Sequence, residues 1–152
     1  MKTYVAREVI QQGATKIEQH GHLHKAKRNL HFSRRIIDDV KDFHEWAIVS
    51  YYYSVYQAAL ALCASKGYKT KSHTATIALL IMLFYPERLT KEDVHAVAKG
   101  IQEEDIRELV ELKKYREDAT YSISIEYEQK LAEQLGETAI AFVNKAEQML
   151  KE

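Results

Sequence analysis

The stretch from Phe43 to Lys66 constrains the fold more than any other, because its apolar residues follow helical spacing on two sides. The two stripes are Trp46, Val49, Tyr53, Tyr56, Leu60 and Cys63, and Ile48, Tyr52, Val55, Ala59 and Leu62. The third side is small or polar and consists of Ser50, Ser54, Gln57 and Ala61. A helix with apolar residues on two sides is the central member of a bundle. Its small side allows another helix or a partner chain to approach closely, and Gly67 is expected to end it.

Turn-forming residues are scarce, since only five glycines and one proline occur among 152 residues. Sheet proteins need more of them, so this shortage favours long helices joined by few connections. Apolar spacing and end signals predict further helices over residues 15–40, 72–86, 90–100, 101–114 and about 126–151. Thr15, Ser72 and Thr90 are the expected first caps, and "TKIE" at Thr15 has the form of a capping box.

Two segments fit this helical pattern less well. Residues 1–14 are expected to form a short extra helix or a frayed segment. The stretch Tyr121–Ile125 alternates like a strand, but it is too short and isolated to build a sheet. The predicted fold is therefore all-α, a single domain over residues 1–152 built as an antiparallel bundle of four to six helices.

The location and redox environment follow from a few counts. Cys63 is the only cysteine, so no internal disulfide can form and a reducing compartment is expected. The N-terminus lacks an apolar core of signal-peptide length, and no window approaches ~18 uninterrupted apolar residues. We therefore expect a cytoplasmic protein that does not associate with a membrane.

The order of several short motifs resembles the HEPN family of small helical proteins. The stretch "SYYYSVYQAALALCASKGYKTKSHTATIALL" is followed about forty residues later by "LKKYREDATY". The matching positions are Tyr52–Tyr53, Ala58–Ala64, Lys66–Gly67, Ser72–His73 and Arg116 to Tyr121. The resemblance implies a helical bundle that forms a homodimer through its long helices. It also implies a possible partner, the minimal nucleotidyltransferase that often accompanies such proteins as an antitoxin.

In the RNase toxins of that family, an Arg-x(4–6)-His motif from each protomer meets at the dimer interface. Arginine offers bidentate donors to a phosphate, while histidine carries the proton. Arg116 matches the arginine, but the histidine positions hold Tyr121, Ser122 and Ile123. Tyrosine is a poor base at neutral pH. Whether the chain is an enzyme, a metal-independent endoribonuclease with Arg116 and Tyr121 in its site, therefore stays open.

Four further residues are candidates for contacting RNA or a nucleotide beside Arg116. Ser50 comes from the central helix, Tyr53 belongs to a tyrosine cluster that can stack on bases, and Lys71 and His73 occupy a small basic loop. Each has a structural alternative, since aromatic stripes are usually core and a basic loop is usually a solvated turn. The pair Glu92 and His95 matches half of a ferritin-like motif, but the chain has no second copy.

Three histidines, His20, His24 and His31, lie along one side of the first long helix. One helix can offer two convergent ligands, whereas a zinc site needs three or four, so we expect no metal and no cofactor. The same flank carries Lys25, Lys27, Arg28, Arg34 and Arg35, which favours contact with nucleic-acid phosphate.

The function predicted from these features is RNA or nucleotide binding by a HEPN-like homodimer that belongs to a toxin–antitoxin or defence pair. Such a protein is either a divergent RNase or a member that binds without cutting. The alternative is a protein-interaction or regulatory bundle, in which Arg116 only caps a helix or pairs with an acidic residue.

Overall fold

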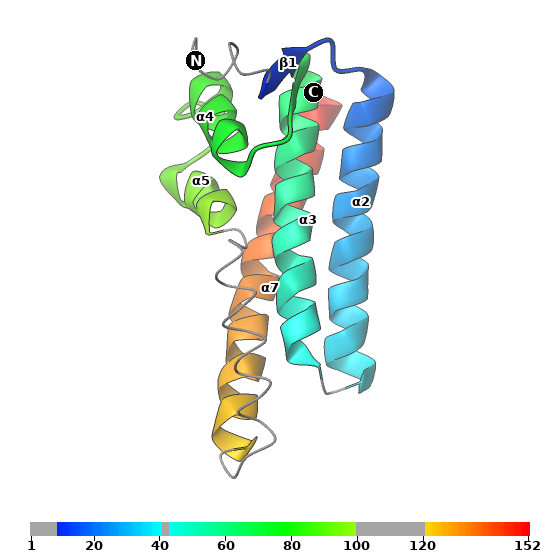
Figure 1. The fold of residues 1–152 in the computed structure, drawn as a ribbon, viewed down its shortest axis with the longest axis vertical. Helices are drawn as coiled ribbons and strands as arrows, with labels where there is room; N and C mark the ends of the chain where they lie inside the picture. Colours follow the sequence, from blue (N-terminus) through cyan, green and yellow to red (C-terminus); the bar gives the residue numbers. More distant parts are fainter. Residues whose placement is uncertain (1–8, 41–42, 100–120) are drawn as a thin grey trace.

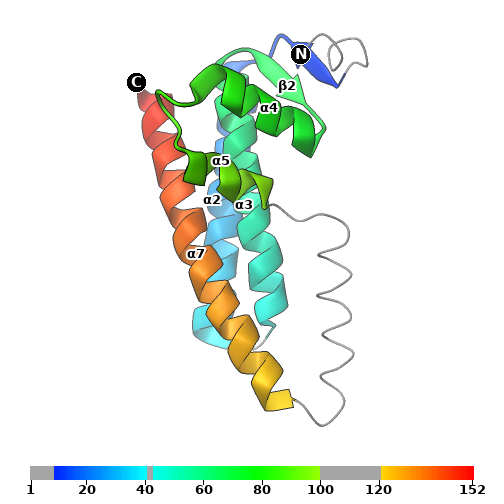
Figure 2. The same ribbon diagram turned by 90° about the vertical axis from the view of Figure 1, so that its left-hand side faces the viewer.

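The computed structural model describes residues 9–40, 43–99 and 121–152, and for residues 121–127 only the backbone. The elements in chain order are β1 (Ile10–Gln12), α2 (Lys16–Arg35), a π-helical turn (Ile36–Val40), α3 (His44–Ser65), β2 (Tyr68–Thr70), α4 (His73–Phe84), α5 (Lys91–Ala98) and α7 (Tyr121–Lys151). Three long helices, α2, α3 and α7, lie side by side, with α2 antiparallel to the other two (Figure 1). The short helices α4 and α5 pack on one side of α3 (Figure 2). The all-α prediction is confirmed.

Local capping sets where α2, α4 and α5 begin. The amide of Thr15 donates to the carboxylate of Glu18 at 2.8 Å, and the amide of Glu18 donates to the Thr15 hydroxyl at 3.2 Å, which confirms the capping box. Ser72 and Thr90 cap α4 and α5 as predicted. The C-terminal stop at Gly67 is also confirmed, with a φ of 83° that glycine adopts without steric cost.

Helix α3 is the central element, but its two-sided burial is only partly as predicted. Most of its second half, residues 58–64, is buried, with Leu62 and Cys63 fully inside the core. The first half of one stripe is instead exposed, since Trp46 is 52% and Tyr53 49% exposed. The buried apolar core that α3 forms with its neighbours includes Ala26, Tyr51, Val55, Leu79, Leu80, Phe84, Leu89, Val97, Ala139, Phe142 and Val143.

The small side of α3 packs on α2, not on a partner chain. Ser50 donates to the carbonyl of Asn29 at 2.9 Å, and Ser33 of α2 donates to the carbonyl of Ala47 at 3.2 Å. Ser33 and Ala47 are fully buried, so the two backbones approach closely along this seam. The other alternative for this face, contact with a second protein, does not apply here.

The structure corrects two predictions about local conformation. Residues 10–12 are neither helical nor frayed, because β1 pairs antiparallel with β2, with Ile10 opposite Thr70. Ile10 is buried, and this burial, together with pairing to a distant strand, stabilises an extended conformation that local propensity does not reveal. The last helix already begins at Tyr121, so the alternating stretch 121–125 is helical. The helix predicted over residues 101–114 lies outside the described residues.

By length and mean hydropathy, α3 is the one helix among the described residues that could cross a membrane. Within that window, 72% of the residues are buried inside the bundle. Packing in the core accounts for the apolar character of this helix.

Candidate functional site

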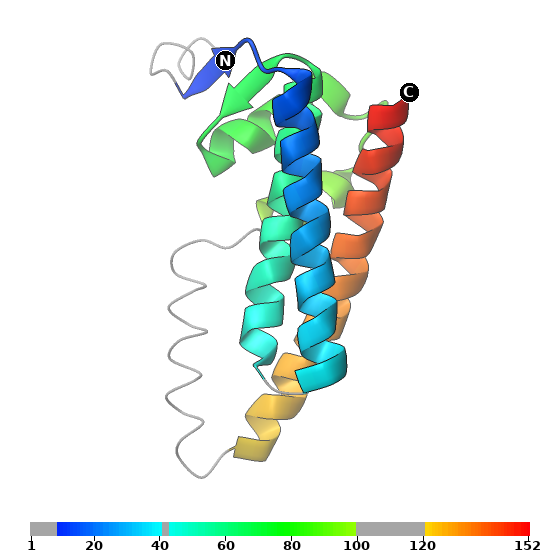
Figure 3. The same ribbon diagram turned by 90° about the vertical axis from the view of Figure 1, so that its right-hand side faces the viewer.

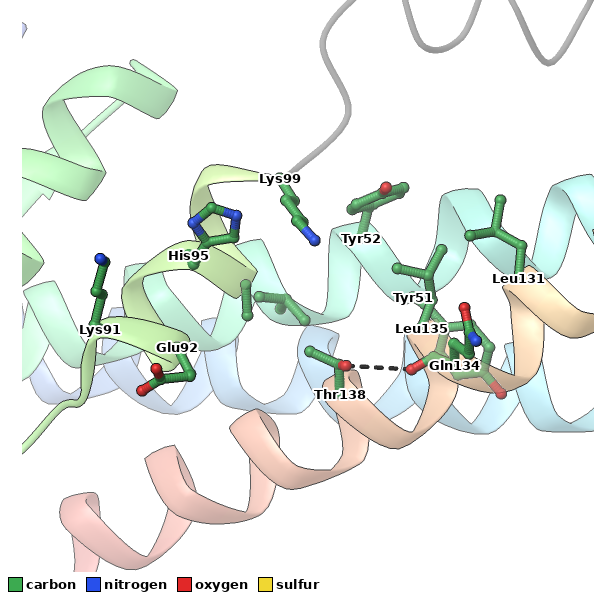
Figure 4. Close-up of a pocket in the computed structure, with 12 residues that line it drawn as sticks. Tyr51, Tyr52, Lys91, Glu92, His95, Lys99, Leu131, Gln134, Leu135 and Thr138 are labelled. Carbon is green, nitrogen blue, oxygen red and sulfur yellow. Dashed lines mark hydrogen bonds between the residues drawn. The ribbon is translucent and has the colours of Figure 1, made fainter.

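A cavity of about 530 Å³ opens between α3, α5 and α7 (Figure 4). The apolar side chains that line it are Tyr51, Val55, Ala96, Leu131 and Leu135. The polar ones are Tyr52, Lys91, Glu92, His95, Lys99, Gln134 and Thr138. A cavity of this size with apolar walls and a few converging polar groups is typical of small-ligand sites. We refer to it as the α5 pocket.

One face of α5, together with the residue that caps its C-terminus, supplies a row of basic side chains along the pocket. Lys91, His95 and Lys99 are spaced by four residues, so they lie one above the other on the same face. All three are exposed, and none forms an ion pair with a residue that the structure describes. Tyr52 of α3 lies beside Lys99 in the close-up (Figure 4). The row therefore presents two ammonium groups and an imidazole to an anion beside an aromatic ring.

Asp93 holds α5 against α7. Its carboxylate accepts from the Thr90 amide at 2.8 Å and from the Thr90 hydroxyl at 3.0 Å, and it pairs with Lys145 of α7. Burial raises the pKa of Asp93. The hydrogen bonds from Lys145 and Thr90 together lower it by a larger amount, so the pKa lies below its ordinary value. Val97, one turn after Asp93 and on the side of α5 away from the basic row, is fully buried. These contacts fix the orientation of the row Lys91, His95 and Lys99.

Tyr51 forms the deep wall of the pocket. It is only 4% exposed, and burial raises the pKa of its hydroxyl, with Arg34 lowering it and Asp38 raising it by smaller amounts. A neutral phenol is therefore maintained far above physiological pH. Tyr51 supplies shape and a hydrogen-bonding hydroxyl, not a charge.

The predicted site residues fall into three groups. Arg116 lies outside the described residues, and Tyr121 begins α7 with its side chain outside them too. Ser50 is buried at the seam between α2 and α3, where its hydroxyl is already bonded to Asn29. The structure thus separates Ser50 from the exposed face of α3.

The remaining candidates lie near one another. The rings of His73 and Tyr56 contact each other at a centroid distance of 5.1 Å and an interplanar angle of 37°, and Tyr53 lies one helical turn before Tyr56 on the same face. Lys71 is exposed in the turn that precedes α4. None of these side chains lines the α5 pocket.

The α5 pocket itself was missed from the sequence. Glu92 and His95 match half of a metal motif, and the pattern that indicates a basic face instead is the four-residue spacing of Lys91, His95 and Lys99. Within the described ranges, no group of three or more His, Cys, Asp or Glu side chains converges as a metal site, and this includes the histidines of α2.

Comparison with known families gives the classification of the chain. The family model of the HEPN domain matches residues 20–149. No curated protein and no solved structure matches the chain. The matched range runs through α2, α3, α4 and α5 and almost to the end of α7. The chain therefore belongs to the HEPN domain family, with a function related in general to nucleotides or RNA.

Proposed function

We propose that the α5 pocket binds a nucleotide unit, either free or within an RNA strand. The observation that carries this proposal is the row Lys91, His95 and Lys99 along one edge of a cavity of about 530 Å³. Such a row of basic side chains attracts a phosphate group, and an aromatic side chain beside it offers a surface on which a base stacks. Tyr52 occupies that position, next to Lys99 (Figure 4).

The opposite wall supports recognition of the base. Gln134 and Thr138 of α7 line the pocket, and the Thr138 hydroxyl donates to the backbone carbonyl of Gln134 at 3.2 Å. A side-chain amide carries both donors and acceptors, so Gln134 matches the edge of a base. Leu131 and Leu135 line the same wall and add apolar surface beside it. Phosphate and base thus meet different sides of one cavity.

The assay uses a fluorescently labelled single-stranded 12-nucleotide RNA and, separately, ATP. In the double variant Lys91→Ala and Lys99→Ala, we expect the affinity for both to fall at least about tenfold, with a shallower salt dependence. The matched control is Lys16→Ala with Lys130→Ala, which removes two exposed lysines elsewhere. Equal binding by the pocket variant and the wild type would refute the pocket as the site.

The proposal extends to biological context. A cytoplasmic toxin–antitoxin or defence pair with a minimal nucleotidyltransferase fits a HEPN protein of this kind. If the chain cleaves RNA, Arg116 stabilises the phosphate and Tyr121 positions it. Arg116→Ala then abolishes cleavage of the labelled RNA while the thermal melt stays unchanged, whereas retained cleavage removes Arg116 from that role.

A homodimer is part of the same proposal. The exposed aromatic side chains at the start of α3, Phe43, Trp46 and Tyr53, support contact with a second copy. Sedimentation is expected to show a dimer that Trp46→Glu converts to a monomer. If RNA binding is absent at low and high salt while this association persists, the alternative function, a protein-interaction bundle, is the better description.

A further inference from the structure

A second hollow lies on the outer face of α2. Its volume is about 550 Å³, and its lining residues are His24, Lys27, Arg28, His31, Phe32 and Arg35. Helix α2 faces the viewer in Figure 3, with α4 and α5 behind the long helices. This surface, the α2 groove, is thus separate from the α5 pocket and shares no residue with it.

The charge of the α2 groove is almost entirely of one sign. Helix α2 contains one acidic residue, Glu18, which caps the helix and pairs with Lys69 at 2.7 Å. Two groove cations are paired, Lys27 with Glu147 at 2.9 Å and Arg35 with Asp39 at 2.7 Å.

Arg28, by contrast, has no ion pair among residues 9–40, 43–99 and 121–152. It is exposed at the centre of the groove, flanked by His24 and His31. An unpaired guanidinium keeps its fork of donors available for a phosphate.

The spacing of the groove residues fits an extended polyanion. His24, Arg28, His31 and Arg35 follow one another at intervals of four, three and four residues, so they form one row. At a rise of about 1.5 Å per residue, the row extends over roughly 16 Å of the helix axis. That length exceeds what a single phosphate group requires.

Phe32 gives the α2 groove a chemical character that basic residues alone lack. This side chain is 53% exposed within the groove and takes no part in the buried core. Sites for single-stranded nucleic acid combine cations that follow the backbone with aromatic rings on which bases stack. An acidic peptide would use the cations but has no planar base for the ring, so a nucleic acid fits both features.

We infer that the α2 groove binds the phosphodiester backbone of a single-stranded nucleic acid, with a base stacked on Phe32. The inference stands independently of the α5 pocket, which holds one nucleotide unit, whereas the groove requires a strand of several. Where both sites act, the protein distinguishes a polynucleotide from a free nucleotide.

The test measures binding of labelled 12-nucleotide single strands, one RNA and one DNA of the same sequence, by fluorescence anisotropy. It uses the Lys91→Ala and Lys99→Ala background so that the pocket does not contribute. Arg28→Glu is expected to weaken binding at least about tenfold. Arg28→Ala should reduce the slope of log affinity against log salt by about one.

Phe32→Ala provides the second, independent readout. It is expected to weaken binding about tenfold through loss of stacking while leaving the salt slope unchanged. Lys130→Glu is the matched control, since Lys130 is exposed on α7 and lies outside the groove. All substituted side chains are exposed, and thermal melts verify that each variant is folded.

Each result of these binding measurements either supports or overturns the proposal for the α2 groove. A loss with Arg28→Glu and Phe32→Ala but not with Lys130→Glu supports the groove, and the RNA and DNA arms then identify the preferred strand. Equal losses of affinity with Arg28→Glu and Lys130→Glu, or no loss with Phe32→Ala, would show that the strand is held only by non-specific charge attraction. Either result would overturn the proposal for the α2 groove. ATP affinity is expected to change only with the substitutions of Lys91 and Lys99. An ATP titration therefore tests the α5 pocket separately from the α2 groove.

Discussion

A Cβ atom on Gly136 would lie 2.9 Å from both Cζ and Oη of Tyr51, closer than side-chain contacts in folded proteins allow. Helix α7 therefore passes the Tyr51 ring at a distance that only glycine permits. Because Tyr51 is the deep wall of the α5 pocket, this contact ties the position of α7 to the shape of the site.

Gly136→Ala is expected to lower the stability of the protein. Alanine gains about 1 kcal/mol in helix propensity, but overpacking against a buried ring costs about 1–3 kcal/mol. Gly21→Ala is the control, since Gly21 lies inside α2 and, apart from its own neighbours and the local helix backbone, no atom lies within 4 Å of the place that an alanine methyl group would occupy, and it should raise stability. Urea titration measures both, and a Gly136→Ala protein as stable as Gly21→Ala would contradict the close contact.

Asp93→Asn should loosen α5 and weaken ligand binding in the pocket. The amide still accepts from Thr90, but the ion pair with Lys145 is lost, at a cost of about 1 kcal/mol. Glu18→Gln alters the equivalent capping box of α2 and serves as the control, with no expected effect on the α5 pocket. Equal losses of RNA binding in the two variants would rule out a specific role for Asp93.

The pKa of Asp93 also predicts how the stability of the protein depends on pH. The pKa of Asp93 is lowered in the folded protein, so its contribution is complete above the ordinary aspartate pKa of about 3.9 and is lost as the pH falls below it. The difference in melting temperature between wild type and Asp93→Asn should therefore shrink on acidification. A difference that grows toward low pH would contradict the direction of the shift.

Ser50→Ala should leave RNA binding unchanged and reduce stability by about 1 kcal/mol. The hydroxyl is buried and bonded to the carbonyl of Asn29, which also accepts from Ser33 at 2.9 Å. In the variant, the carbonyl of Asn29 loses the hydrogen bond from Ser50 and keeps the one from Ser33. A selective loss of RNA affinity, with stability unaffected, would return Ser50 to the set of binding residues.

Cys63 should not react with a thiol reagent in the native protein. It is fully buried, and burial raises the pKa of its thiol to about 12, so almost no thiolate forms at neutral pH. Labelling with a chromogenic disulfide is expected only on unfolding by urea. Rapid labelling of the native protein would show that the core around α3 opens readily.

Features encoded within a few residues could be predicted from the sequence. The capping box at Thr15, the caps Ser72 and Thr90 and the stop at Gly67 depend on neighbours one to four positions away. Such contacts are independent of the rest of the fold, so the helix order and the all-α class followed from them.

Contacts between distant segments could not be predicted in the same way. The pairing of β1 with β2 joins residues about sixty positions apart, and the α5 pocket joins Tyr52, His95 and Gln134 from three helices. Periodicity identifies an apolar face but not its neighbour. For this reason Trp46 and Tyr53 were expected in the core although they face outward.

Trp46 is the only tryptophan of the chain, and half of its surface is open. Indole emission from the folded monomer will consequently resemble that of a hydrated fluorophore and change little in wavelength when the bundle melts. A blue shift on raising the protein concentration would signal that another molecule has covered the beginning of α3. The chain thus carries its own optical reporter for association at that face.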